Sequence, residues 1–147
     1  MIKNYTSTVP VSRSVQHIED RLVKHGAQKI VKEYDQDKKL AAICFTLMLN
    51  GREIPFKIPA RVANVEKMLR GSVRRPTSGT YERIAEQAER SAWKLVSDWV
   101  DIQISLVELQ QVEFMEVFLP YVYSPADRLT FFERLRDGSF KLLTEYK

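Results

Sequence analysis

An uninterrupted stretch from Tyr81 to about Gln111 constrains the fold of this chain most strongly, because it contains neither glycine nor proline. Apolar residues recur in it at every third or fourth position, which is the spacing of one face of an α-helix. This stripe consists of Ile84, Ala88, Ala92, Leu95, Trp99, Ile102 and Leu106. The pattern predicts one helix of roughly 30 residues, a length more typical of a bundle or coiled coil than of a small globular domain.

Further apolar residues broaden this face of the predicted helix: Trp93, Val96, Val100 and Val107. A helix with so wide an apolar face needs more than one neighbour. The neighbours are either the preceding part of the chain or another copy of it, so a homo-oligomer is one expectation. The helix itself either ends near Gln111 or continues to Phe118, since the sequence stays apolar beyond Val112.

The sequence near the carboxy-terminal end predicts a shorter helix after the long one. Ser124 to Asp127 resembles a helix start with proline in the first turn, and Gly138 is expected to end that helix. The last residues, Phe140 to Tyr146, are too apolar for a solvated tail, and we expect them to pack.

The amino-terminal part is expected to contain a short strand followed by a helix. Asn4 to Val11 carries β-branched residues and allows a short first strand. Ser12 or Ser14 can cap the helix that follows, and Gly26 lies where a left-handed residue commonly ends a helix. The apolar face of this helix consists of Val15, Ile18 and Leu22.

Three strands are predicted next: Lys29 to Tyr34, Leu40 to Leu49 and Arg52 to Ile58. The middle strand is apolar on both faces and belongs in the centre of the sheet. Asp35 to Lys38 forms a polar turn before it, and Asn50-Gly51 after it is the dipeptide of a type I′ hairpin turn. Pro55 lacks a ladder donor and places the third strand at an edge.

The third strand and the helix after it contribute to the predicted core. The core-facing residues of the strand are Ile54, Phe56 and Ile58. Pro59 and Ala60 open a helix that runs to about Arg70. Its inward residues are expected to be Val62, Val65, Met68 and Leu69.

Together these elements predict an α+β fold: helix, three-stranded antiparallel sheet and helix, followed by a long helix and a short helical C-terminal region. We expect a mixed α/β module with a β-hairpin over 1–71, a basic loop over 72–80, and a helical region over 81–147 packed on the module as one domain. Double-stranded-RNA-binding domains share the order of the first module, but they contact phosphates through a lysine-rich second helix. Ala60 to Lys67 has no such cluster, so the order does not imply that function.

Composition limits the classes of protein to consider. The 147 residues are 44% hydrophobic and 29% charged, which excludes disorder as the main state. The single cysteine, Cys44, excludes an internal disulfide and a multi-cysteine zinc site. No apolar run reaches the length of a membrane span, and Met1 to Thr6 lacks the apolar core of a signal peptide, so we expect a cytoplasmic protein with no membrane partner.

Charge is distributed unevenly along the chain. The net charge is +4, but the part up to Arg75 has 15 Lys and Arg against 7 Asp and Glu, a net +8, and the remainder has a net charge of −4. Positive fields attract phosphates or acidic protein surfaces. Gly71 to Thr80, with two glycines and a proline, reads as a mobile basic loop at this boundary.

Residues that could perform catalysis or bind a metal are few. His17 and His25 lie eight residues apart with no acidic or cysteine ligand at a recognised spacing. Cys44 lies inside the central strand, and we interpret it as a small core hydrophobe. The five glycines never cluster into a phosphate-binding loop. The sequence therefore predicts no enzyme, no cofactor and no metal.

Carboxylates offer one further test for an enzyme. A two-metal nuclease needs clustered acidic groups, often with a lysine. The candidates are Asp35, Asp37, Glu53 and Lys57. Glu53 and Lys57 are not two residues apart, as the usual Glu-x-Lys arrangement requires, which argues against a nuclease. Asp98 and Asp101 on the long helix are explained by a solvated face.

The basic residues around the loop are the best candidates for a functional surface. They are Arg70, Arg74, Arg75, Arg83, Arg90 and Lys94. Steps of seven and four keep the last three near one stripe of the long helix, so the six could meet one phosphate backbone. A solvated surface remains an alternative, because Glu82, Glu86 and Glu89 interleave with them.

Three segments carry a resemblance to known proteins. Ala92 to Gln103, Glu116 to Tyr121 and Ile54 to Pro59 resemble a signature of small uncharacterised proteins from bacteriophages, prophages and other bacterial mobile elements. The resemblance covers most of the chain but rests on core-type residues. It implies an accessory role in replication, recombination or defence and assigns no activity or site.

Two hypotheses of function follow from the sequence. The first is a non-enzymatic mobile-element protein that binds nucleic acid or a nucleoprotein complex through the basic loop and helix. The alternative is a protein-interaction or inhibitor module that oligomerises through its long helix and binds a host or phage protein, with an acidic surface as the partner of the basic residues.

Overall fold

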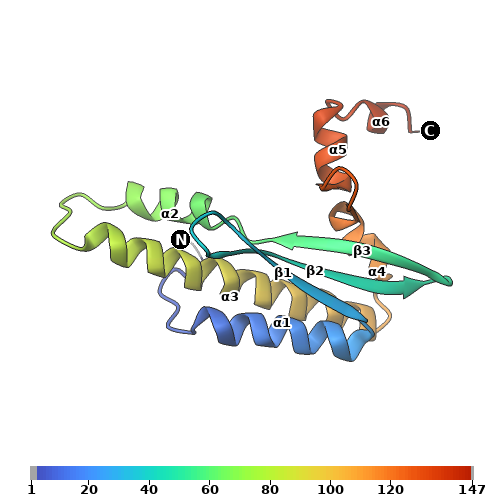
Figure 1. Cartoon of the computed structure of the whole chain (residues 1–147), viewed down its shortest axis with the longest axis horizontal. Helices are drawn as coiled ribbons and strands as arrows, with labels where there is room; N and C mark the ends of the chain where they lie inside the picture. Colours follow the sequence, from blue (N-terminus) through green and yellow to red (C-terminus); the bar gives the residue numbers. More distant parts are fainter. Residues whose placement is uncertain (1–2, 147) are drawn as a thin grey trace.

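The computed structural model describes residues 3–146 and shows a three-stranded antiparallel sheet covered on one face by helices (Figure 1). The sheet consists of β1 (Lys29–Tyr34), β2 (Leu40–Leu49) and β3 (Arg52–Pro59), in that spatial order. The main helices are α1 (Val11–His25), α2 (Val62–Gly71) and α3 (Thr80–Glu108). The predicted α+β fold and the order of its elements are confirmed.

The amino-terminal segment differs from its prediction. Residues 4–10 form turns and no strand, because side chains of α3 bind their backbone: Ser91 Oγ donates to the Asn4 carbonyl (2.7 Å) and Gln87 Nε2 to the Ser7 carbonyl (3.0 Å). The predicted serine cap is also wrong, since α1 begins directly after Pro10 without a side-chain cap. At its other end α1 does stop at Gly26, whose φ of 119° is left-handed.

The strands follow the sequence prediction closely. β2 is central and β3 lies at an edge, with Phe45 opposite Phe56 in the register. Asn50 and Gly51 have φ values of 52° and 77°, as a type I′ turn requires. The turn thereby fixes which residues of β2 and β3 face the helices.

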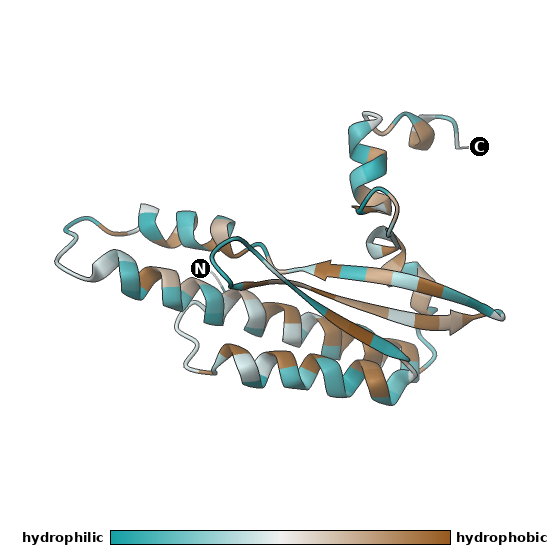
Figure 2. Ribbon diagram, in the orientation of Figure 1, coloured by the Kyte–Doolittle hydropathy of each residue, from teal (hydrophilic) through white to brown (hydrophobic). Residues whose placement is uncertain are grey.

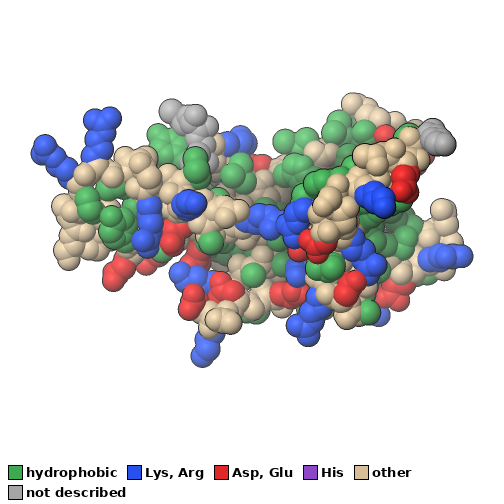
Figure 3. Space-filling view, turned by 90° about the horizontal axis from the view of Figure 1, so that it is seen from above, with side chains coloured by type: hydrophobic (Ala, Val, Ile, Leu, Met, Phe, Trp, Pro, Cys, Tyr) green, Lys and Arg blue, Asp and Glu red, His purple; other side chains and the backbone are tan. Residues whose placement is uncertain are grey.

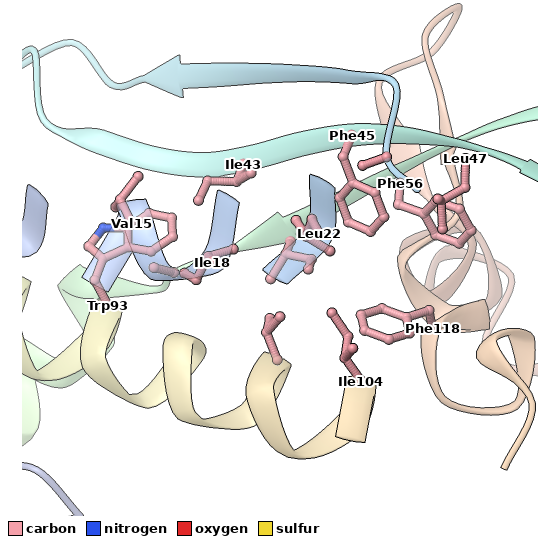
Figure 4. Close-up of a cluster of buried hydrophobic side chains, with 14 of the residues drawn as sticks. Val15, Ile18, Leu22, Ile43, Phe45, Leu47, Phe56, Trp93, Ile104 and Phe118 are labelled. Carbon is pink, nitrogen blue, oxygen red and sulfur yellow. The ribbon is translucent and has the colours of Figure 1, made fainter. Parts of the chain in front are cut away.

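The core lies between the sheet and helices α1, α3 and α4 (Phe114–Phe118). Figure 4 shows Ile18 and Leu22 of α1 between Ile43 of the sheet and Ile104 of α3. At one end, Phe45 stacks on Phe56 with ring centroids 5.0 Å apart. At the other, the buried Trp93 donates from Nε1 to the Leu40 carbonyl at 3.3 Å, so its polar atom is not left unpaired.

Helix α3 has 29 residues and confirms the predicted long helix, which ends at Glu108 rather than continuing to Phe118. Its buried face overlaps the predicted apolar face in part, since Ala88, Ala92, Trp93 and Val100 are buried. The residues that face the sheet are Trp93, Ser97, Val100 and Ile104. Ile102, from the predicted stripe, is 55% exposed. The expectation of several neighbours holds, because α1 and α2 both pack against α3.

Helix α2 begins at Val62, two residues later than predicted, and runs alongside the first half of α3 (Figure 1). Val62 and Val65 pack against the core. Met68 was expected to point inward and instead is 64% exposed. Only one side of this short helix can meet α3, and Met68 lies outside that contact.

The region after α3 is more irregular than predicted. Its elements are α4, a 3₁₀ turn η1 (Leu119–Tyr121), strands β4 (Tyr123–Ser124) and β5 (Leu129–Thr130), and helices α5 (Phe131–Asp137) and α6 (Lys141–Thr144). Ser124 to Asp127 belongs to a hairpin and does not start a helix. The helix start lies at Thr130, whose hydroxyl accepts from the Glu133 N–H while Glu133 accepts from the Thr130 N–H, a capping box.

The last residues do not pack as expected. Helices α5 and α6 project away from the sheet and the three main helices. Figure 2 shows that the hydrophobic residues of α6 lie apart from those of the sheet and the main helices. Leu142, Leu143 and Tyr146 are 59%, 56% and 89% exposed. Among the residues described, no helix has the length and apolar character needed to cross a membrane.

Candidate nucleic-acid interface

The basic loop lies at the end of the α2–α3 hairpin, beyond the sheet (Figure 1). Two hydrogen bonds fix its second half: the Thr77 N–H donates to Thr80 Oγ1 at 2.8 Å, and the two threonine hydroxyls are 2.9 Å apart. Gly79 has a left-handed φ of 79° and lets the chain turn into α3. The first half of the loop carries Arg74 and Arg75, both exposed.

Arg70 and Arg83 flank the loop on the two helices. The Arg70 guanidinium lies 4.6 Å from the ring centroid of Tyr81, and its Nε is 3.5 Å from Glu66 Oε2. Arg83 is exposed, with Nη2 3.5 Å from Thr80 Oγ1. We call Arg70, Arg74, Arg75 and Arg83 the arginine tip.

Most guanidinium groups of the arginine tip have no acidic partner among the described residues, although Arg70 pairs with Glu66. Within residues 3–146, Arg74, Arg75 and Arg83 form no ion pair. Figure 3 shows basic side chains projecting from the end of the molecule where α2 and α3 are joined. Free, solvated guanidinium groups on a projecting turn are available to phosphate oxygens.

Arg90 and Lys94 are placed differently from the other predicted contact residues. Arg90 donates from Nε to the Ser7 carbonyl (3.3 Å) and from Nη2 to Gln87 Oε1 (2.7 Å). Lys94 Nζ lies 2.7 Å from Asp98 Oδ1. Arg90 therefore binds the amino-terminal segment to α3, whereas Lys94 pairs within α3. The structure gathers the other four of the six predicted residues at the tip.

Asp98 belongs to this internal network rather than to a metal site. Burial disfavours its ionised form, but hydrogen bonds from Lys94 and from Asn4 Nδ2 (2.9 Å) outweigh burial, so the pKa of Asp98 is lowered. The negative charge of this carboxylate is therefore balanced by Lys94 and hydrogen-bonded by Asn4.

The other residues considered for chemistry do not converge. His17 Nε2 lies 3.5 Å from Asp101 Oδ1, whereas His25 stacks on Phe114 with ring centroids 5.3 Å apart. Asp35 accepts two N–H bonds in the β1–β2 turn, and Glu53 pairs with Lys29 near the opposite end of β2. The described residues contain no group of three or more His, Cys, Asp and Glu side chains able to hold a metal.

Cys44 does not belong to the buried core, contrary to its interpretation as a core hydrophobe. Ile43 and Phe45 take the core face of β2, so Cys44 lies on the outer face and is only partly buried. Its Sγ is 3.4 Å from Glu33 Oε1. Burial first, and then the Glu33 carboxylate, raise its pKa to about 12, which keeps the thiol protonated.

Tyr81 is the surface residue that the sequence did not single out. It is 44% exposed and lies against Arg70, eleven residues earlier in the chain. Helix and strand periodicity cannot predict a contact between residues on either side of a loop. Arg70 and Tyr81 meet because α3 runs back alongside α2. An exposed aromatic ring beside arginines is a common platform for an unpaired base.

Comparisons with known proteins give no relative: no protein-family model, no curated protein and no solved structure matches this chain.

Proposed function

We propose that this protein binds nucleic acid, alone or in a nucleoprotein complex, through the arginine tip and acts by binding rather than by catalysis. The observation that carries the proposal is the exposure of Arg74 and Arg75 at the end of the α2–α3 hairpin without ion-pair partners among the described residues. The resemblance to mobile-element proteins supports an accessory role in replication, recombination or defence.

The chemistry of the tip suits phosphate and base contacts together. Arginine guanidinium groups bind phosphate oxygens in a bidentate manner, which fixes orientation as well as charge. Tyr81 offers a ring on which a base can stack, next to the Arg70 guanidinium. Arg90 and Lys94 contribute to the electrostatic potential but not direct contacts, because they are held by Ser7, Gln87 and Asp98.

The test is fluorescence anisotropy with labelled single-stranded and duplex DNA and RNA over a salt series. Four phosphate contacts on a duplex give a slope of about −3.6 in log K against log salt, so affinity falls roughly 100-fold between about 50 and 200 mM salt. Replacement of Arg74 and Arg75 by glutamate should abolish binding. Absence of wild-type binding at about 50 mM salt contradicts the proposal.

A matched control separates the tip from net charge. Arg13→Glu/Arg52→Glu makes the same change of charge at two exposed sites, at the start of α1 and beside the β2–β3 turn. We expect this variant to retain most of the affinity. Equal losses in both double variants would show that overall charge, and not the tip, determines binding.

The second candidate is a protein-interaction or inhibitor module. It is favoured by exposed apolar side chains on α5 and α6, which we call the carboxy-terminal arm (residues 131–144). Leu142 and Leu143 of this arm are 59% and 56% exposed, so no described residue buries them. A protein of this class would show no salt-dependent binding to any of the four nucleic acids.

A further inference from the structure

Helix α3 carries a second apolar stripe, which is buried against the core at Ala92 and exposed at Ile102. Its residues alternate at steps of four and three, the heptad spacing of helix-to-helix packing. We call this set the outer seam: Ala88, Ala92, Leu95, Trp99, Ile102, Leu106 and Leu109. It interleaves with the sheet-facing residues, so one helix has two packing surfaces.

The two halves of the outer seam have different surroundings. Ala88 and Ala92 are 0% and 4% exposed, in the half of α3 along which α2 packs. In the other half, Ile102 and Leu109 are 55% and 68% exposed. Trp99 lies within this half and is partly buried, with its ring centroid 5.3 Å from that of Phe118 and 5.4 Å from that of Tyr121. The outer seam is therefore buried in the half of α3 that packs against α2 and is exposed to solvent at Ile102 and Leu109.

We propose that the open half of the outer seam, from Leu95 to Leu109, pairs with the same segment of a second copy of this chain. Its spacing suits a helix as the occupant, because knobs at steps of four and three fit the holes of another helix with the same period. Such a surface is self-complementary, as a two-fold dimer requires.

The charges beside the seam permit contact between two identical surfaces. The flanking positions Gln103, Ser105 and Gln110 are uncharged. The acidic side chains in this part of α3 are Asp98, Asp101 and Glu108. Lys94 lies 2.7 Å from Asp98, and Arg21 of α1 lies 2.8 Å from Asp101 and 3.2 Å from Glu108. Two copies therefore meet without the repulsion between like charges that opposes self-association in most charged helix surfaces.

The position of α2 selects the antiparallel arrangement. A parallel pair would bring both α2 helices to the same end, where they would hold the α3 helices apart. In an antiparallel pair the α2 helices lie at opposite ends. Layers then form between Leu95 and Leu106 of the second copy, and between Trp99 and Ile102 of the second copy.

This dimer would place two arginine tips at its far ends. Linking two contact sites raises the apparent affinity for a long nucleic acid without any new contact. Self-association does not depend on the proposed function, so the two can fail separately. The paired segment is about 22 Å long. It buries less area than a standard interface, so we expect a Kd in the micromolar range.

Sedimentation equilibrium tests the association. Wild-type protein at up to about 300 µM, well above a micromolar Kd, should reach twice the 17.1 kDa mass of the chain. Ile102→Glu should raise the Kd roughly 100-fold, because the charge would be buried on pairing. Since Ile102 is exposed in the single chain, the variant should keep its circular dichroism spectrum. Leu142→Glu, at an exposed site on α6, is the control and should dimerise normally.

A wild-type protein that stays monomeric at this concentration overturns the proposal. So does a dimer whose Kd is unchanged by Ile102→Glu, or one whose Kd is raised by Leu142→Glu and not by Ile102→Glu, since the interface would then lie on the carboxy-terminal arm.

Disulfide trapping tests the orientation in a Cys44→Ser background. Leu95→Cys and Leu106→Cys proteins should cross-link when mixed, and each alone should give little cross-linked product. Efficient cross-linking of Leu95→Cys with itself would indicate a parallel pair and overturn the antiparallel arrangement. If neither the mixture nor either single protein cross-links, in samples that sediment as dimers, the outer seam is not the interface.

Discussion

Cys44 shows how one side chain takes its properties from two neighbouring strands. It lies on the outer face of β2, opposite Lys57 of β3 in the register, and its Sγ contacts Glu33 of β1. Burial and the Glu33 carboxylate raise its pKa from 9.0 to about 12, while Lys57 opposes the shift. Because the acid form is stabilised, the thiol stays protonated and unreactive up to alkaline pH.

This pKa predicts slow alkylation of the native protein. At pH 8 the thiolate fraction of Cys44 is about 1000-fold below that of a thiol with the ordinary pKa, so iodoacetamide should react about 1000-fold more slowly with the folded than with the urea-unfolded chain. Glu33→Gln should speed the native reaction by removing the negative charge. A native rate that levels off near pH 9, as it does for a thiol with the ordinary pKa, would contradict the raised pKa.

At the scale of elements, the turn between β2 and β3 depends on backbone conformation. Gly51 has a φ of 77°, and a Cβ added there would meet open space. Strain is therefore the main cost of a side chain at this position.

Gly51→Ala should lower the free energy of unfolding by about 1 kcal/mol. Gly71 offers the matched control, since it also faces open space but ends α2 with no positive φ. Gly71→Ala should be neutral or stabilising by up to about 1 kcal/mol. Urea titration of both variants measures the difference, and equal effects would contradict the role assigned to the turn.

At the scale of the whole molecule, the basic and acidic halves of the sequence neutralise each other in part. Arg21 of α1 lies 2.8 Å from Asp101 and 3.2 Å from Glu108 of α3, and Lys39 lies 3.0 Å from Glu89. These ion pairs reduce the excess positive charge of the first half along the body, whereas Arg74, Arg75 and Arg83 of the tip have no such pair among the described residues.

The carboxy-terminal arm contributes little to the core of the whole molecule. Among the described residues, none after Phe118 belongs to the buried core cluster, although Val122 packs against it, and α6 is exposed. A chain shortened after Gly138 should keep its melting temperature within about 3 °C, since a loss below 0.5 kcal/mol is expected for exposed residues. Differential scanning calorimetry measures this, and a much lower melting temperature would show that the arm packs in solution.

Local sequence signals predicted the elements whose cause is local. The turn at Asn50-Gly51 and the helix end at Gly26 depend on backbone angles that few residues adopt, and the long α3 depends on a run without glycine or proline. The sequence also predicted the exposed pair Arg74 and Arg75, because a loop of small polar residues leaves arginines in solvent.

Tertiary structure decided the features that involve distant residues. Helix α3 has two apolar faces, and only the packing of Trp93 and Ile104 against the sheet selected one of them, which left Ile102 exposed. Arg90 became an internal donor because the amino-terminal segment lies beside it. Periodicity extends over a few turns of one helix and determines which residues share a face, whereas the choice of the buried face depends on surfaces that meet only when the chain folds.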